Sequence, residues 1–232
     1  MEAIILAGGL GTRLRSVVSD LPKCMAPVAG RPFLQYIIRH LQQQGVTSFI
    51  FSVGYLYEAI ESFLQKEYPS INYQLSIETS PLGTGGAIQL ACAKTTAENV
   101  LVVNGDTMFS INVHRLMTAQ LNKPAACTLA LKPMQHFNRY GVVQLNSNSC
   151  ITAFEEKKYY AEGLINGGVY ALNTKALLQK KLPEKFSFEK DYLEQFVHEG
   201  HFYGLPQDDY FIDIGIPEDY EKAQQQFAGF DF

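Results

Sequence analysis

Two cations stand behind a glycine-rich turn near the start of the sequence, in the stretch AIILAGGLGTRLRSVVSDLPKCMAPVAGRPFL (residues 3–34). Gly8, Gly9 and Gly11 allow the backbone to come close to a ligand and to point several N–H groups at its oxygens. The planar fork of Arg13 suits two oxygens of a pyrophosphate, and the compact charge of Lys23 suits a phosphoryl group. The combination predicts a polyphosphate site at the end of the first strand, where open parallel sheets bind ligands.

Two common glycine motifs do not fit this turn. A dinucleotide fingerprint of the form GxGxxG needs a third glycine at the position of Leu14. A P-loop needs the dipeptide Gly-Lys followed by Ser or Thr, and that register is absent. A tight turn with a surface arginine is the simpler interpretation of such a short loop taken alone.

Two aspartates follow apolar runs elsewhere in the chain. Asp106 comes directly after NVLVVNG, and Asp213 lies in YFIDIGIPEDY before a predicted helix that opens at Pro217. Taken singly, each aspartate could be a turn or cap residue. Beside a triphosphate, however, carboxylates repel their ligand unless a divalent ion lies between them, and hard oxygen ligands suit Mg²⁺. Asp106 and Asp213 are therefore candidate metal ligands, and Glu218 and Asp219 are predicted as structural residues of the helix's first turn.

The composition excludes several classes of partner. The net charge of −4 provides no general field for nucleic acid, whose binding needs a basic face. No apolar stretch approaches the length of a membrane span, and the N-terminus lacks the basic segment of a signal peptide. The cysteines are widely spaced, without the paired spacing of zinc sites or disulfide scaffolds, at positions 24, 92, 127 and 150. We expect unpaired thiols and a cytoplasmic protein that binds neither nucleic acid nor membrane.

Strand-like runs alternate with helical patterns through the first half of the chain. Strands are predicted at 3–7, 49–53, 73–77 and 99–106, and helices at 32–45, 57–68, 85–94 and 111–120. This alternation favours βαβ units and a mainly parallel sheet with helices on both faces. The second half has closely spaced strands with little helix between them, at 125–132, 140–145, 151–157 and 163–172. That pattern indicates a mixed or antiparallel extension of the same α/β domain.

The opening stretch also matches the pattern GGxGTRLxxxxxxxPKxxxPVxGxPxL, and so resembles the signature of the sugar-1-phosphate nucleotidyltransferases. The resemblance implies a Rossmann-like fold of the nucleotide-diphospho-sugar transferase type and Arg13 and Lys23 as catalytic residues. It also implies Mg²⁺ as cofactor, with Asp106 and Asp213 as its ligands. It implies one domain over 1–232, with a nucleotide-binding half (1–125) and a sugar-binding half (126–232). The implied nucleotide-binding residues are Leu6, Ala7, Gly8, Gly9, Gly11, Thr12, Glu78, Gly83, Thr84 and Gly86.

The segment IETSPLGTGGAI places a carboxylate, Glu78, where the family reads the base. An ionised carboxylate only accepts hydrogen bonds, and guanine offers adjacent N1–H and N2–H₂ donors that fit it side by side. Uracil and thymine present one N–H between two acceptors. The sequence therefore predicts GTP as substrate. If Glu78 faces solvent instead, a uridylyl- or thymidylyltransferase of the same fold becomes the alternative.

By the same resemblance, the residues of the sugar site are Gly141, Glu156, Lys157, Asn166 and Gly167. Glu155 is an alternative to Glu156, because neighbouring residues of a strand face opposite ways. Lys158 stands where the family usually has proline, so the local turn is expected to differ. FSFEKDYLEQF resembles the branch that acts on D-glycero-α-D-manno-heptose 1-phosphate, with mannose 1-phosphate as the alternative.

The leading function is therefore an enzyme that joins a nucleotide to a sugar 1-phosphate and releases pyrophosphate, for cell-surface glycan synthesis. A catalytically silent relative is the alternative from another class. Silent relatives are expected to lack one of the cations or metal carboxylates, all of which are present here. The apolar tail AGFDF could dock on another copy of the chain, which makes a homo-oligomer a further hypothesis.

Overall fold

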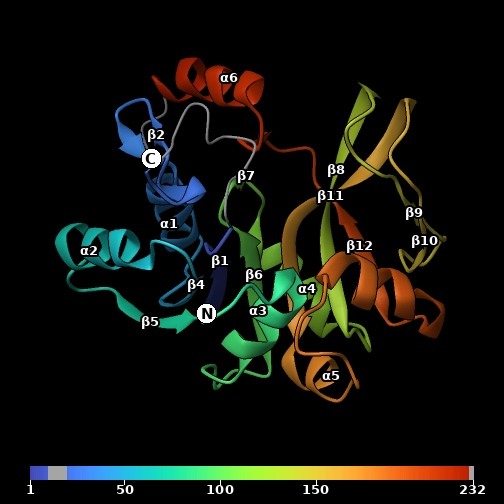
Figure 1. The fold of residues 1–232 in the computed structure, drawn as a ribbon. Helices are drawn as coiled ribbons and strands as arrows, with labels where there is room; N and C mark the ends of the chain where they lie inside the picture. The colour runs from blue at the N-terminus through green and yellow to red at the C-terminus, as the bar shows by residue number, and fades with distance from the viewer. Residues whose placement is uncertain (10–19, 230–232) are drawn as a thin grey trace.

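A computed structural model describes residues 1–9 and 20–229 of the chain. In this part of the chain a central sheet of seven strands has the order β12-β8-β11-β6-β1-β4-β5 (Figure 1). β11 runs antiparallel to its neighbours β6 and β8, and the other strand pairs are parallel. The strands are β1 (Glu2–Leu6), β4 (Ser48–Val53), β5 (Asn72–Ile77), β6 (Asn99–Asn104), β8 (Cys127–Phe137), β11 (Tyr160–Asn173) and β12 (Phe202–Pro206). The predicted mixed, mainly parallel sheet is confirmed.

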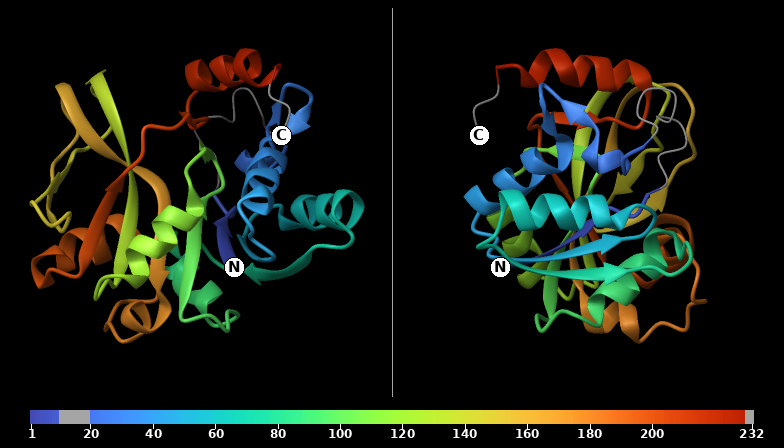
Figure 2. Two further views of the ribbon diagram at one scale, coloured as in Figure 1. Left: turned by 180° about the vertical axis from the view of Figure 1, so that it is seen from behind. Right: turned by 60° about the vertical axis from the view of Figure 1, so that its left-hand side comes forward.

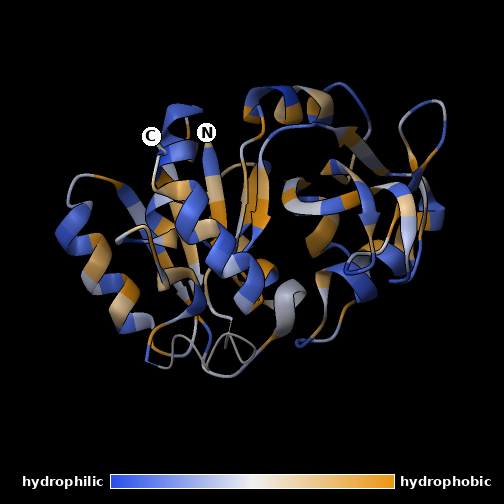
Figure 3. Ribbon diagram, turned by 90° about the horizontal axis from the view of Figure 1, so that it is seen from above, coloured by the Kyte–Doolittle hydropathy of each residue, from blue (hydrophilic) through white to orange (hydrophobic). Residues whose placement is uncertain are grey.

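Helices cover both faces of the sheet (Figures 1 and 2). One face carries α1 (Phe33–Gln43), α2 (Tyr57–Glu67), α4 (Val113–Leu121) and α6 (Pro217–Phe227). The other carries α3 (Gly83–Cys92), α5 (Thr174–Leu178) and the π-helical turn η2 (Phe188–Glu194). Both cores draw on the same strand, since Ala3 and Ile5 of β1 face the first and Ile4 the second. Burial of both faces of the sheet explains the continuous apolar runs of its strands. Figure 3 shows that the helices alternate between polar and apolar residues.

The second half extends the sheet as the sequence predicts. β8 and β11 are the longest strands described, with 11 and 14 residues, and their paired ends continue beyond the rest of the sheet (Figure 1). The hairpin of β9 (Val143–Leu145) and β10 (Ile151–Phe154) lies beside them. The remaining short elements are η1 (Lys23–Met25), β2 (Pro27–Val28), β3 (Arg31–Pro32), β7 (Thr107–Phe109), η3 (Val197–Glu199) and β13 (Phe211–Asp213).

The four cysteines are free thiols, as predicted. Burial raises the pKa of Cys24 and of Cys92 to about 12, which keeps these thiols protonated and unreactive. Among the described helices, none has the length and apolar character needed to cross a membrane.

Candidate active site

Asp106 and Asp213 lie far apart in the sequence and meet through a short pair of strands. β7 and β13 are antiparallel, and Asp213 is opposite Thr107, the residue after Asp106. The backbone N–H of Ile214 also donates to the carbonyl oxygen of Asp106, at 3.0 Å. This pairing brings together the two carboxylates that the sequence predicts as metal ligands.

Lys23 lies between these two carboxylates. Its Nζ forms an ion pair with Asp106 Oδ2 and lies 3.8 Å from Asp213 Oδ1. Its side chain is only 15% exposed. A Cβ on Gly215 would come within 2.9 Å of the lysine Nζ and 2.7 Å of Asp213 Oδ1, so glycine keeps this corner open. Lys23 is therefore a fixed part of the site and not a solvated surface lysine.

The two aspartates suit a hard cation. Burial raises the pKa of Asp213, and the nearby charge of Asp106 raises it further, while Lys23 opposes both effects. A metal ion close to both carboxylates would relieve the mutual repulsion that contributes to this shift. The described residues contain no group of three or more potential metal-binding side chains, so this part of the chain would supply the two carboxylates of Asp106 and Asp213. Mg²⁺ is usually held in this way, by one or two carboxylates plus substrate phosphates and water.

Arg139 is a second cation at this centre, one that the sequence analysis missed. Its Nη2 lies 3.8 Å from Asp213 Oδ2, and its Nη1 forms an ion pair with Asp219 in the first turn of α6. Although burial opposes it, the hydrogen bonds from Arg139 and Lys222 hold the pKa of Asp219 below its usual value. Asp219, predicted to be structural, therefore also anchors the arginine that faces Asp213.

We expect the substitution Arg139→Ala to weaken the use of Mg²⁺. Asp213 would lose the contact that fixes its orientation, and we expect this loss to outweigh the stronger attraction for a cation that follows from removing a positive neighbour. Charge-assisted contacts contribute about 1.5–3 kcal/mol, so kcat/KM should fall about tenfold or more. The measurement is turnover over a range of Mg²⁺ concentrations, with half-saturation moving to higher Mg²⁺. Lys222→Ala is the matched control, because Lys222 contacts Asp219 3.1 Å away on the exposed side of α6. Equal behaviour of the two variants would contradict this role for Arg139.

A small cavity of about 160 Å³ lies beside Lys23, at the carboxyl ends of β1 and β6. Five of the residues predicted to bind the nucleotide or the metal line it, namely Leu6, Ala7, Gly9, Thr84 and Asp106. Lys23, Cys24, Asn104 and Gly105 complete the lining. Gly105 closes the strand end tightly, since its N–H donates to Leu6 O at 2.9 Å and a Cβ there would lie 2.6 Å from the same oxygen. The predicted residues Gly11, Thr12 and Arg13 lie outside the described residues.

Glu78 lies against the glycine-rich turn. A Cβ on Gly8 would come within 2.8 Å of Glu78 Oε1, and Glu78 Oε2 accepts a hydrogen bond from the N–H of Leu82 at 2.9 Å. Burial raises the pKa of Glu78, and the hydrogen bond from Leu82 opposes that shift. The carboxylate therefore faces the turn, with one oxygen engaged by the backbone.

The glycines after Glu78 serve close packing. A Cβ on Gly83, where φ is +73°, would lie 2.5 Å from Phe186 O, and one on Gly86 would lie 2.3 Å from Glu184 O. The N-terminus of α3 is therefore packed directly on the segment that leads into η2. Thr84 continues this contact, because its hydroxyl donates to Glu189 Oε2 at 2.8 Å.

A larger cavity, of about 540 Å³, lies next to this centre between the β9–β10 hairpin, β11 and η2. We call it the sugar cavity, because residues predicted for the sugar site line it. Four of the predicted sugar residues line it: Gly141, Glu156, Lys157 and Asn166. The fifth, Gly167, is not among its lining residues, since it packs against the ring of Phe109, where a Cβ would lie 2.4 Å away. Asn166 is held by an irregularity in β11, where its Oδ1 accepts from the N–H of Gly168 at 3.0 Å.

The choice between Glu155 and Glu156 can now be narrowed. Glu155 accepts hydrogen bonds from Gln144 at 2.5 Å and from the Tyr160 hydroxyl at 3.0 Å. These contacts, with that from Gln144 the largest, lower the pKa of Glu155. Within the described parts of the chain, no hydrogen-bond or ion-pair partner is recorded for the side chain of Glu156. The geometry favours Glu156 as the free acceptor. Lys158, in place of proline, lies 3.7 Å from Glu155.

The sequence analysis missed several residues of the sugar cavity, namely Tyr140, Ser187, Glu189, Lys190 and Glu194. The last four lie in or beside η2, where FSFEKDYLEQF combines charged residues with an aromatic core, so the charges in that segment were the available signal. Burial and the charge of Asp213 raise the pKa of Tyr140 to about 12, so its hydroxyl stays protonated.

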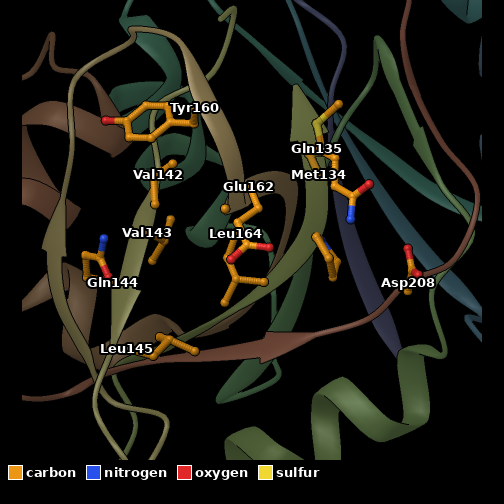
Figure 4. A pocket seen from close by; sticks show the side chains of 12 residues that line it. Met134, Gln135, Val142, Val143, Gln144, Leu145, Tyr160, Glu162, Leu164 and Asp208 are labelled. Atoms are coloured by element: carbon orange, nitrogen blue, oxygen red, sulfur yellow. The ribbon is translucent and has the colours of Figure 1, made fainter. Parts of the chain in front are cut away.

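A cavity of about 820 Å³, larger than the sugar cavity, lies on the other side of β9 (Figure 4). Val142 to Leu145 form one wall, opposite Glu162 and Leu164 of β11, with Met134 and Gln135 of β8 further along (Figure 4). It shares Val142 and Val143 with the sugar cavity. None of its lining residues is among the predicted site residues, so size alone does not identify the active site.

Comparison with known proteins agrees with this fold and this site. The sequence matches the family described as nucleotidyl transferase over residues 2–229, and the chain belongs to that family. It is 52% identical to D-glycero-alpha-D-manno-heptose 1-phosphate guanylyltransferase of Aneurinibacillus thermoaerophilus, over 97% of this chain and 98% of the relative. The protein of that name from Campylobacter jejuni is 45% identical, over 95% of this chain and 97% of the relative.

A solved structure confirms the fold. The crystal structure of HddC from Yersinia pseudotuberculosis superposes with a TM-score of 0.88 and 38% identity, over 97% of this chain and 99% of that chain. HddC has also been solved complexed with GMP-PN, at 37% identity and the same TM-score. The predicted resemblance and fold are thus confirmed, whereas the division into halves at residue 125 stays a prediction.

Proposed function

We propose that this protein transfers GMP from GTP to D-glycero-α-D-manno-heptose 1-phosphate and releases pyrophosphate. The observation that carries the proposal is the ammonium of Lys23 between two carboxylates, beside a glycine turn and near a cavity lined by four residues predicted for the sugar site. The two relatives at 52% and 45% identity, named as guanylyltransferases for this heptose phosphate, support it.

In this reaction an oxygen of the sugar phosphate attacks the α-phosphorus of GTP. A new P–O bond forms, the bond from the α-phosphorus to the bridging oxygen breaks, and pyrophosphate leaves with that bonding pair. Such a step needs alignment of two anions and neutralisation of the charge on the leaving group. Bound Mg²⁺ would supply part of that neutralisation and would be held by Asp106 and Asp213. Lys23 would hold the phosphoryl oxygens, since its ammonium is fixed beside Asp106 and Asp213 and lines the small cavity next to the glycine turn.

Glu78 is the residue that we propose selects the base. It borders Gly8, and its carboxylate can accept from the adjacent donors of guanine but from only the single N–H of uracil. Reorientation of the oxygen now engaged by Leu82 would free both acceptors.

We expect Glu78→Gln to lower the preference for GTP over UTP. The amide keeps the shape but replaces one acceptor by a donor, which faces the donors of guanine. A lost hydrogen bond of this kind should reduce the ratio of kcat/KM values by about tenfold or more. Competition between GTP and UTP gives this ratio directly. Glu58→Gln, an exposed change on α2, is the control. An unchanged ratio in Glu78→Gln would remove this residue from the base site.

The direct test is pyrophosphate release with Mg²⁺, each of the four nucleoside triphosphates and a panel of sugar 1-phosphates. The expected result is turnover with GTP and the manno-configured heptose phosphate above all other pairs. Higher kcat/KM with mannose 1-phosphate would move the proposal to the mannose-1-phosphate guanyltransferases, represented by the 31% identical protein of Schizosaccharomyces pombe. Turnover with UTP alone would overturn the assignment of the base.

Two further parts of the proposal are cellular. We place the reaction in the cytoplasm, in line with the free thiols, and assign its product to cell-surface glycan synthesis. The end of the predicted docking tail, residues 230–232, lies outside the described residues, so the homo-oligomer stays a prediction.

A further inference from the structure

A chain of side-chain hydrogen bonds runs from the sugar cavity through the core to the N-terminus of α3. Asn166 Nδ2 donates to the Tyr170 hydroxyl at 2.9 Å, and that hydroxyl donates to Glu189 Oε1 at 3.4 Å. The other carboxylate oxygen, Oε2, accepts from the hydroxyls of Thr84 at 2.8 Å and of Ser187 at 3.1 Å. Asn166, Ser187 and Glu189 line the sugar cavity, and Thr84 lines the small cavity beside the glycine-rich turn. The chain therefore joins the two cavities.

The carboxylate of Glu189 sets the direction of these hydrogen bonds. An ionised carboxylate can only accept, so the Tyr170 hydroxyl gives it its single proton. Burial and the charge of Glu189 raise the pKa of Tyr170, so this proton stays on the hydroxyl. With its proton directed at Glu189, the hydroxyl oxygen can only accept from Asn166.

The side-chain amide of Asn166 is held at both ends. Its Oδ1 accepts from the backbone N–H of Gly168 at 3.0 Å, and its Nδ2 donates to the Tyr170 hydroxyl. A flipped amide would place its NH₂ against a backbone N–H and its oxygen against the hydroxyl oxygen, so both contacts select the same orientation. Among the described residues Nδ2 has no other acceptor, and Asn166 lines the sugar cavity. The second N–H of the amide is therefore available to an oxygen of a ligand in that cavity.

Tyr170 lies behind the cavity wall and not in it. Its side chain is 1% exposed, and it is among the lining residues of neither cavity. Its ring packs edge-on against Phe188, with the ring centroids 5.1 Å apart. The Tyr170 hydroxyl therefore acts on a ligand only through the residues that it contacts, and of these Asn166 has a free donor.

We propose that Tyr170 is a positioning residue of the sugar site: its hydroxyl, directed by Glu189, holds the Asn166 amide with an N–H toward an oxygen of the sugar 1-phosphate. This rests on the proposed function. A donor that is already fixed loses little conformational freedom when the substrate binds. Without the Tyr170 hydroxyl the amide can turn, so sugar binding should weaken. Glu189 keeps its contacts with Thr84 and Ser187, so nucleotide binding should not change.

The test compares Tyr170→Phe with Tyr192→Phe. Both rings are buried in the same core and pack against Phe188, but the Tyr192 hydroxyl has no hydrogen-bond partner among the described residues. We expect Tyr170→Phe to raise the KM for the sugar 1-phosphate about five- to tenfold, while the KM for GTP stays within about twofold. Calorimetry should show weaker binding of the GDP-sugar product and unchanged binding of GDP. Tyr192→Phe should change none of these constants.

A double variant shows whether Tyr170 acts through Asn166. If it does, Tyr170→Phe should have little further effect on the KM for the sugar 1-phosphate in an Asn166→Ala background, because the residue that it positions is gone. Two effects that multiply in the double variant would show that Tyr170 does not act through Asn166.

The outcomes separate this inference from the function on which it rests. If the unchanged enzyme releases pyrophosphate with no sugar 1-phosphate, both fail together. If it does turn one over, but Tyr170→Phe behaves like Tyr192→Phe or raises both KM values equally, only the inference fails. Thermal unfolding shows whether each variant is folded. Should Tyr170→Phe not fold, Glu189→Gln tests the same chain, because its amide can turn a donor toward the Tyr170 hydroxyl, and an unchanged KM for the sugar 1-phosphate would then overturn the inference.

Discussion

Replacing Lys23 with alanine is expected to lower kcat for GDP-sugar formation by about 10²- to 10³-fold. We expect this loss of activity because of where the Lys23 ammonium lies. The Lys23 ammonium contacts Asp106, lies 3.8 Å from Asp213, and lines the cavity beside the glycine turn. It is thus the described cation best placed to hold phosphoryl oxygens while charge shifts to pyrophosphate. Its loss also leaves two carboxylates facing each other with one compensating charge fewer.

Lys23→Arg is expected to restore little of this activity. The Gly215 backbone comes close to the lysine Nζ, since a Cβ there would lie 2.9 Å from it, so the wider, planar guanidinium fits this corner poorly. Steady-state pyrophosphate release measures both variants. Lys66→Ala serves as control, because the Lys66 side chain is 82% exposed and forms its ion pair with the adjacent Glu67. If Lys23→Ala keeps more than about a tenth of the unchanged kcat while correctly folded, the lysine does not stabilise the transition state.

Local sequence patterns were sufficient for most of the fold. The helix predicted at 32–45 is α1 (Phe33–Gln43), ending before Gly45 with its φ of +81°, and strand 3–7 is β1. These elements follow from the spacing of apolar residues and from Pro and Gly at the ends of the elements. Both are features of short sequence segments. The antiparallel extension was also visible, since closely spaced strands leave no room for crossover helices.

The active site was harder, because its residues meet through pairings between distant segments. Asp106 and Asp213 converge only because β7 pairs with β13, and both strands have just three residues. Such short strands carry almost no periodic signal. Arg139 was missed for a related reason: its partners Asp213 and Asp219 belong to the other end of the chain. The motif gave the identity of the ligands, and the strand pairing gave their arrangement.

The winding of η2 was beyond sequence reasoning altogether. Residues five apart do not share a face in an α-helix, so nothing in FSFEKDYLEQF suggested that Glu189 and Glu194 line one cavity. The preceding segment is fixed by glycines of α3, since Gly83 and Gly86 leave no space for side chains against Phe186 and Glu184. Tertiary packing of this kind overrides local propensity.

The second large effect is expected from Asp213→Asn and Asp106→Asn. Each removes one anionic oxygen ligand from a site that offers Mg²⁺ only two protein carboxylates among the described residues. We expect kcat to fall at least about 100-fold, and half-saturation with Mg²⁺ to move upward. Titration with Mg²⁺ after removal of metal by a chelator measures both quantities, and the chelated enzyme itself should be inactive. Asp208→Asn, at an exposed ion pair with Lys132, is the control.

Stability should respond to Asp213→Asn in the opposite direction from activity. Burial and the charge of Asp106 raise the pKa of Asp213, so its ionised form is less favourable in the folded chain than in the unfolded one. At neutral pH this ionisation opposes folding, and the penalty disappears only as the pH falls below the raised pKa. The neutral asparagine removes the penalty, so the melting temperature of the metal-free variant should equal or exceed that of the unchanged protein. A lower melting temperature together with full activity would show that Asp213 is a structural residue. If Asp213→Asn instead loses turnover while its melting temperature stays the same or rises, Asp213 serves ligand binding and not stability.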